Sequence, residues 1–169
     1  ENTAYDNVTI KNCFIKEFQY GAYFSGSGTG NSTFYNNTLY NNTYGIHTNN
    51  AKGFNISGNN ATQGSSYGIW TIITDDSFIE NNYCDSNDYG IVNSHGSSNN
   101  TIRNNTCRSN SNYGILIDHS TSENNTYINN HLASNTNGAI NHLNSATGNI
   151  VIYNNSFGEV YWLGDDNLT

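Results

Sequence analysis

The chain has 169 residues, of which 34% are hydrophobic, 13% are aromatic and 11% are charged, and its formal net charge at pH 7 is −8. This length favours one domain, and the acidic balance argues against nucleic acid as a partner. No apolar run reaches about 18 residues, so the sequence predicts no direct membrane span.

Two short motifs recur along the chain with one period. Tyr-Gly, continued by Asn137-Gly138, recurs every 22 to 24 residues and begins at Tyr20, Tyr44, Tyr67, Tyr89 and Tyr113. A second series consists mostly of Asn-Asn pairs, at Asn12-Cys13, Asn36-Asn37, Gly58-Asn59, Asn81-Asn82, Asn104-Asn105, Asn129-Asn130 and Asn154-Asn155. Because both series keep one period, we predict about seven stacked coils of 22–25 residues.

Apolar residues keep the same frame and predict three short strands per coil. The first inward series precedes the Asn pair by two positions: Ile10, Phe34, Ile56, Ile79, Ile102, Tyr127 and Ile152. The second follows the pair by two positions: Ile15, Leu39, Ala61, Cys84, Cys107, Leu132 and Phe157. The third follows the Gly of Tyr-Gly: Ala22, Ile46, Ile69, Ile91, Ile115 and Ala139. Such coils bury little alone, so we expect them to stack as a parallel β-solenoid.

The chain contains 35 asparagines, and the solenoid gives many of them a structural role. Asparagines at the same turn of successive coils can pass an amide hydrogen bond from coil to coil. We expect this ladder to consist of Asn12, Asn36, Asn37, Asn59, Asn81, Asn82, Asn104, Asn105, Asn129, Asn130, Asn154 and Asn155.

The unit NNTI-x-NN-x-[ILC]…YGI resembles the repeat of NosD-like and pectate-lyase-like proteins, from about Asn7 to Phe157. The resemblance implies an all-β, right-handed parallel β-helix. We place this domain at residues 1–160, and residues 161–169, where the pattern breaks, form a C-terminal tail or partial cap. The superfamily includes polysaccharide lyases, hydrolases and epimerases as well as non-catalytic surface proteins, so the resemblance implies a fold without one activity.

Acidic and imidazole side chains recur near the end of the third predicted strand. If they face outward, they form a strip that could act as acid and base on a glycan. This alternative catalytic set consists of Asp75, Asp76, His95, Asp118 and His119. TDD and SHG are similar to fragments of the polygalacturonase motifs, but the Arg-x-Lys motif of that family is absent. The simpler interpretation is a solvated turn with no catalytic residue.

A divalent metal is the corresponding alternative for the imidazoles. Its ligands would be His95, His119 and His142. The resemblance to NosD-like proteins, which are linked to periplasmic copper handling, implies the same possibility. Because no HxH or CxxC spacing occurs, we expect no cofactor.

Two cysteines occupy one inward column of adjacent predicted coils. The Cα atoms of Cys84 and Cys107 should lie about 5 Å apart, within disulfide range. Stacked side chains point in parallel, so we expect two buried thiols, with a disulfide as the alternative.

Eleven Asn-x-Ser/Thr sequons predict covalent N-glycans. Three of them contain ladder residues. The remaining acceptors are Asn7, Asn31, Asn41, Asn55, Asn60, Asn99, Asn124 and Asn167.

Taken together, these features predict a glycosylated, non-catalytic scaffold or adhesion module outside the cell or on its surface. Its expected partners are copies of itself or other surface proteins, and polysaccharide. The alternative is a carbohydrate-active enzyme of the pectate-lyase-like superfamily that uses the Asp and His strip.

Overall fold

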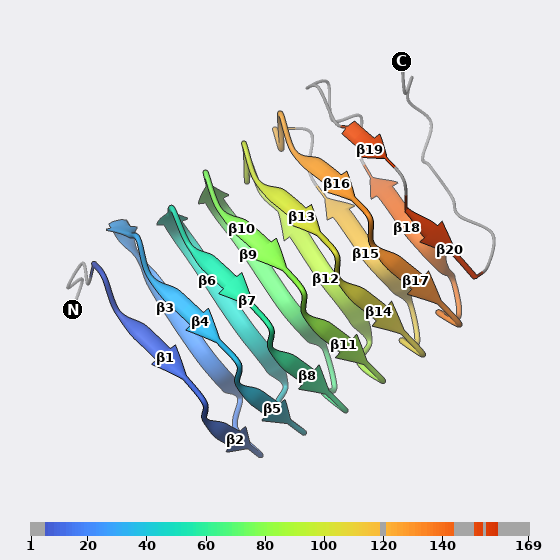
Figure 1. Cartoon of the computed structure of the whole chain (residues 1–169), viewed down its shortest axis with the longest axis horizontal. Helices are drawn as coiled ribbons and strands as arrows, with labels where there is room; N and C mark the ends of the chain where they lie inside the picture. Colours follow the sequence, from blue (N-terminus) through green and yellow to red (C-terminus); the bar gives the residue numbers. More distant parts are fainter. Residues whose placement is uncertain (1–5, 119–120, 144–150, 154, 159–169) are drawn as a thin grey trace.

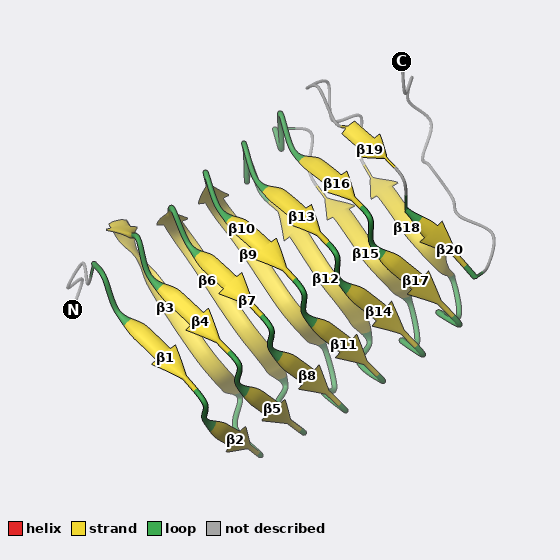
Figure 2. Ribbon diagram, in the orientation of Figure 1, coloured by secondary structure: helices red, strands yellow, loops and turns green. Residues whose placement is uncertain are grey.

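The computed structural model describes residues 6–118, 121–143, 151–153 and 155–158. These residues form short β-strands that wind into an elongated stack of coils (Figure 1). The described residues include no helix, and therefore none that could cross a membrane. Strands of successive coils pair in parallel and make three sheets, coloured yellow in Figure 2.

Sheets A and B consist of very short strands, and sheet C consists of longer ones. Sheet A contains β1 (Thr9–Lys11), β4 (Thr33–Tyr35), β7 (Asn55–Ser57), β10 (Phe78–Glu80), β13 (Thr101–Arg103), β16 (Thr126–Ile128) and β19 (Val151–Tyr153). Sheet B contains β2 (Phe14–Lys16), β5 (Thr38–Tyr40), β8 (Asn60–Thr62), β11 (Tyr83–Asp85), β14 (Thr106–Arg108), β17 (His131–Ala133) and β20 (Ser156–Phe157). Sheet C contains β3 (Tyr20–Gly30), β6 (Tyr44–Lys52), β9 (Tyr67–Asp75), β12 (Tyr89–Ser94), β15 (Tyr113–Asp118) and β18 (Gly138–Leu143).

The predicted parallel solenoid is confirmed, with two corrections. Sheet C has six strands, so the described chain makes about six complete turns rather than about seven. The last coil is also shifted by one residue, because Ile140, and not Ala139, is the register partner of Ile115. Both Ala139 and Ile140 are nevertheless buried in the core.

The core lies between the three sheets and contains the predicted inward residues. Register pairs such as Ile79 with Ile102 place like side chains directly over one another. Cys84 and Cys107 are register partners as well, and both are fully buried free thiols. Burial raises the pKa of the Cys107 thiol well above its usual value, and the hydrogen bond with Cys84 adds to the rise.

Three corners join the sheets within each coil, and each corner has the same two-residue device. We name them corner CA, AB and BC, after the sheets they connect. The first residue is left-handed, with φ between 50° and 67°, a region that Asn and Gly tolerate best. The second residue turns inward. The left-handed residues at corner CA are Asn7, Asn31, Gly53, Asp76, Asn99 and Asn124; at corner AB they are Asn12, Asn36, Gly58, Asn81, Asn104 and Asn129; at corner BC they are Glu17, Asn41, Gln63, Ser86, Ser109 and Ser134.

The amide ladder of corner AB contains only the second residue of each pair. Each Nδ2 donates to the Oδ1 of the next coil at 2.9–3.0 Å, through Asn37, Asn59, Asn82, Asn105, Asn130 and Asn155. The first residues, which were predicted to belong to the same ladder, lie outside it at the surface, where Asn36 Nδ2 donates to Asn12 Oδ1 at 2.8 Å. All five described first residues are exposed, because the left-handed residue points its side chain away from the core: Asn12, Asn36, Asn81, Asn104 and Asn129. Asn154 lies outside the described residues.

Two further ladders were not predicted. At corner BC, amides link Asn87, Asn110 and Asn135. At corner CA, Ser77 donates its backbone N–H to Asn100, which donates to Asn125. All three corners are therefore closed by buried side-chain hydrogen bonds.

The Gly of Tyr-Gly is required by close packing between coils. A Cβ on Gly90 would lie 2.4 Å from the carbonyl oxygen of Gly114 and 2.8 Å from the Cβ of Cys107. Gly45, Gly68 and Gly114 meet the same obstacle. This column of glycines lets sheet C approach sheet B.

Candidate functional site

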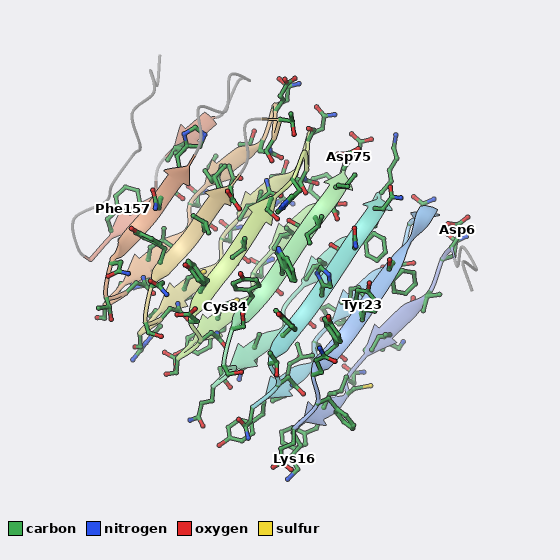
Figure 3. The ribbon with its side chains drawn as sticks, turned by 180° about the vertical axis from the view of Figure 1, so that it is seen from behind. Asp6, Lys16, Tyr23, Asp75, Cys84 and Phe157 are labelled. Atoms are coloured by element: carbon green, nitrogen blue, oxygen red, sulfur yellow. The ribbon has the colours of Figure 1, made fainter. Side chains whose placement is uncertain are left out.

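The outer face of sheet C carries three columns of side chains that run along the axis. The first column is Tyr20, Tyr44, Tyr67, Tyr89 and Tyr113. The second is Tyr23, His47, Trp70, Val92, Leu116 and Asn141. The third is Ser25, Asn49, Ile72, Ser94 and Asp118. Figure 3 shows this face, with Tyr23 lying on it.

The rings of the first two columns form one continuous contact network, which we call the aromatic band. The His47 ring lies between the Tyr23 ring, at a centroid distance of 5.0 Å, and the Trp70 ring, at 4.2 Å. Tyr20 stacks on Tyr44 at 5.0 Å. The band continues through edge and tilted contacts to Tyr67, Tyr89 and Tyr113. Neighbouring rings cover each other's faces, while most of the ring side chains remain partly exposed.

His47 is the imidazole at the centre of the band, and it is uncharged at neutral pH. Burial lowers its pKa, and the hydrogen bond with the Trp70 carbonyl opposes this only in part. Its Nδ1 lies 3.2 Å from that carbonyl oxygen and therefore carries the proton. The next ring is fixed too, since Trp70 Nε1 donates to Ser94 Oγ at 3.1 Å.

The phenols of Tyr67 and Tyr89 are kept protonated. Burial raises the pKa of both, and nearby phenols and the carboxylates of Asp88 and Asp118 raise it further. Both tyrosines can therefore donate and accept hydrogen bonds at the surface of the band.

Polar side chains border the band where the strands of sheet C begin. The carboxylate of Asp88 accepts a short hydrogen bond from Asn112 Nδ2, and Asn137 Nδ2 donates to Asn112 Oδ1. Asp118 lies at the opposite end, in the third column. The face therefore offers rings in the middle and hydrogen-bonding groups on both sides.

The predicted catalytic strip is divided between two positions. Asp75 Oδ1 accepts the Ser98 N–H at 2.8 Å, and Asp76 forms an ion pair with Lys52 at 2.9 Å, both at corner CA. The second position is beside the third column of sheet C. There His95 has a left-handed backbone and directly follows Ser94, just as Ile73 directly follows Ile72 in the coil before. Figure 3 shows Asp6 and Asp75 at one rim of the cylinder and Lys16 at the other. His119 lies outside the described residues.

The alternative metal ligands are separated as well. His142 is the register partner of Ile117, on the inward side of sheet C, and it is buried. His95 is exposed at the turn. Among the described residues, no group of three or more His, Cys, Asp or Glu side chains is arranged to hold a metal ion.

The predicted glycan acceptors within the described residues all lie on the surface. Exposed side chains belong to Asn7, Asn31, Asn41, Asn55, Asn60, Asn99 and Asn124. Asn36 and Asn104, set aside as ladder residues, are exposed as well. Asn167 lies outside the described residues, as do residues 161–169.

Sequence reasoning missed the aromatic band. Tyr23, His47 and Trp70 each follow the Tyr of Tyr-Gly by three residues, a spacing that is visible in the sequence. Val92 and Leu116 replace rings at this position in the next two coils. The signal therefore extends over only half of the chain.

Comparisons with known proteins agree on the fold. A family described as "Right handed beta helix region" matches residues 2–157. No curated protein matches the sequence. Among solved structures, a mutant of the periplasmic alginate epimerase AlgG has a TM-score of 0.80 at 19% identity, covering 89% of this chain and 40% of that one. The A-module of the Azotobacter vinelandii mannuronan C-5 epimerase AlgE4 has a TM-score of 0.65 at 15% identity, covering 89% of this chain and 53% of that one. This chain thus spans about two fifths to half of these proteins, and the likeness is one of fold.

Proposed function

Because the chain belongs to the right-handed β-helix family, we propose that it is a carbohydrate-active protein that binds a polysaccharide along the outer face of sheet C. The observation that carries this proposal is the aromatic band. It extends over consecutive coils parallel to the axis, so it suits an extended polymer better than a compact ligand. Partly exposed rings with polar atoms at their edges are typical of ligand-binding surfaces.

The hydrogen-bonding groups around the band support the same ligand class. Sugar hydroxyls donate and accept, and each can pair with a protonated phenol, a carboxylate or an amide. Tyr67 and Tyr89 supply phenols, Asp88 and Asp118 supply carboxylates, and Asn112 supplies an amide. A binding surface of this kind needs no metal.

The solved structures support a carbohydrate ligand independently. Both proteins named above are epimerases of alginate or mannuronan, and one is periplasmic. We infer an exported location for this chain on the same ground. The non-catalytic scaffold role predicted from the sequence has no comparable support. From the alternative, a carbohydrate-active enzyme, we therefore retain the carbohydrate ligand.

Binding rather than catalysis is proposed, because the acidic groups of corner CA already have partners. Asp75 holds a backbone N–H and Asp76 holds Lys52. A polysaccharide that contacts the aromatic band would meet Asp118 and the phenols first.

Two matched alanine variants test this proposal. Tyr23, on sheet C, and Tyr35, on sheet A, are 49% and 50% exposed. Binding is measured by affinity electrophoresis in gels that contain soluble polysaccharides, neutral and anionic. We expect Tyr23→Ala to weaken binding by about 1 kcal/mol, or roughly fivefold, and Tyr35→Ala to leave it unchanged. Equal effects of the two variants, or no retardation by any polysaccharide, would overturn the proposal.

A further inference from the structure

The positive charges of the chain avoid the face that carries the aromatic band. The chain has five Lys and Arg residues, and all of them lie within the described residues. Four belong to sheets A and B: Lys11, Lys16, Arg103 and Arg108. Of these, Arg103 contacts Glu80 at 2.6 Å and Arg108 contacts Asp85 at 3.2 Å.

Lys52 is the single cation of sheet C, and it is already paired. It ends β6 at corner CA, where its Nζ lies 2.9 Å from Asp76 Oδ2. Asp75, close to the same corner, adds a second negative charge near it. A carboxylate on a ligand would have to displace Asp76 to use this ammonium group.

The charged groups beside the band are therefore negative. Asp88 and Asp118 both lie close enough to Tyr67 and Tyr89 to act on their phenols. His47, which could carry positive charge, is buried and uncharged. Among the described residues of this face, an anionic sugar meets two carboxylates and no unpaired Lys or Arg side chain.

We infer that the outer face of sheet C selects neutral glycans and disfavours polyuronates. The inference rests on the proposed function and specifies its ligand class. It also distinguishes the ligand of this chain from those of the two similar structures, which are epimerases of alginate and mannuronan. Like charges brought together at a binding surface weaken binding, so the carboxylates of Asp88 and Asp118 disfavour an anionic glycan.

A pair of hexasaccharides isolates the charge. Mannohexaose and the mannuronate hexamer, both β-1,4-linked, differ only at C6, where a hydroxymethyl group replaces a carboxylate. Binding is followed by Trp70 fluorescence in a Trp162→Phe variant, which leaves Trp70 as the only tryptophan. A chelator is included so that no divalent ion bridges carboxylates. A panel of other neutral and uronate oligosaccharides is measured in parallel by calorimetry.

The neutral member should bind at least about tenfold more tightly at low salt. The gap should narrow as the ionic strength rises to ~1 M, where the screening length falls to about 3 Å. Asp88→Asn combined with Asp118→Asn should strengthen uronate binding several-fold relative to neutral binding, because the amides keep hydrogen-bonding atoms while both negative charges are lost. The control, Glu80→Gln combined with Asp85→Asn, removes two charges from the opposite sheets and should change neither.

Each other result has a definite meaning. Tighter binding of uronates than of their neutral counterparts overturns the charge inference and leaves the polysaccharide-binding proposal standing. An equal gain in uronate affinity from both double variants shows that net charge, and not this face, sets the preference, and also overturns the inference. Failure of every oligosaccharide to bind removes the proposed function and the inference with it.

Discussion

Replacement of Asn105 by alanine tests whether the corner AB ladder holds neighbouring coils together. Asn105 is fully buried, and its Nδ2 donates to the Ile79 carbonyl at 2.8 Å and to Asn130 Oδ1 at 3.0 Å. Its Oδ1 accepts both the backbone N–H and the Nδ2 of Asn82, each at 3.0 Å. Alanine removes all four side-chain hydrogen bonds.

The expected loss follows from the two donors left without a partner. The backbone N–H and one Nδ2 proton of Asn82 stay buried, since Asn82 itself is 2% exposed. Each buried unsatisfied donor costs ~1–3 kcal/mol. We therefore expect the free energy of unfolding to fall by about 4 kcal/mol, a large fraction of the ~5–15 kcal/mol typical of a domain.

Asn104→Ala is the matched control, because it changes the same residue type one position earlier. Asn104 is exposed and has φ of 54°. Alanine at this position removes no buried ladder bond, and the free energy of unfolding should fall only by the cost of its left-handed backbone, about 1–2 kcal/mol. Urea unfolding followed by circular dichroism measures both variants, and hydrogen exchange of the Asn82 amide measures the loss locally.

The two measurements can refute the reasoning. Similar destabilisation by both variants would mean that the ladder contributes no more than the turn conformation. Unchanged protection of the Asn82 amide in Asn105→Ala would mean that this N–H does not depend on the ladder.

Four other predictions follow from described features. Burial raises the pKa of the Tyr127 phenol far above 10, so the native state binds more protons and stability falls as pH rises above about 10; urea midpoints should show a flatter decline in Tyr127→Phe. Burial lowers the pKa of His47, so stability falls as pH drops below about 6.5, and a His47→Phe variant with the same acid slope would contradict this. Gly90→Ala should lower the unfolding free energy by ~1–3 kcal/mol, because its Cβ would meet the Gly114 carbonyl; an unchanged midpoint would refute the packing argument. We propose that exposed sequons carry N-glycans in the exported protein, which an intact mass that falls on deglycosylation would confirm and an unshifted mass would contradict; the acceptors are Asn7, Asn31, Asn36, Asn41, Asn55, Asn60, Asn99, Asn104 and Asn124.

The inward residues could be predicted because every coil imposes the same requirement on them. Ile56, Ile79 and Ile102 must each contact the coil before and the coil after, so one residue type recurs at one period. Register then follows from the hydrophobic pattern alone. The last coil departs from it because the position opposite Tyr113 is occupied by Gly138, which follows the Asn of the motif.

The two asparagines of each pair could not be distinguished from the sequence. Asn104 is selected for its backbone and Asn105 for its amide, yet both requirements favour the same residue type. At the other corners the Asn columns are interrupted, at corner BC by Gly64 and at corner CA by Phe54 and Ser77, so neither forms an unbroken series. The sequence therefore shows two identical residues where the structure has one exposed and one buried side chain.

The outer face was predicted least well, because solvent places few demands on it. The partners of Trp70 in the second column are His47 and Val92, and all three fit a position that needs only to cover the sheet. A surface column can change at each coil without harming the fold. The residues proposed to bind the ligand therefore do not follow the repeat, and the repeat could not predict them.

The repeated corner device makes the length of the molecule independent of its cross-section. Residues 83–105 run from one corner AB ladder residue to the next, and the ladder hydrogen bonds that Asn82 donates into this segment are repeated by those that Asn105 donates to Asn130. A tandem copy of the segment would thus insert one coil and keep the corner AB ladder continuous. Between Ser94 and Asn100 this coil has one residue more than the coil before has between Ile72 and Ser77, which shows that an extra residue is accommodated upstream of the ladder residue Asn100. The outer face of sheet C in such a chain can therefore be lengthened in steps of one strand spacing, about 4.8 Å.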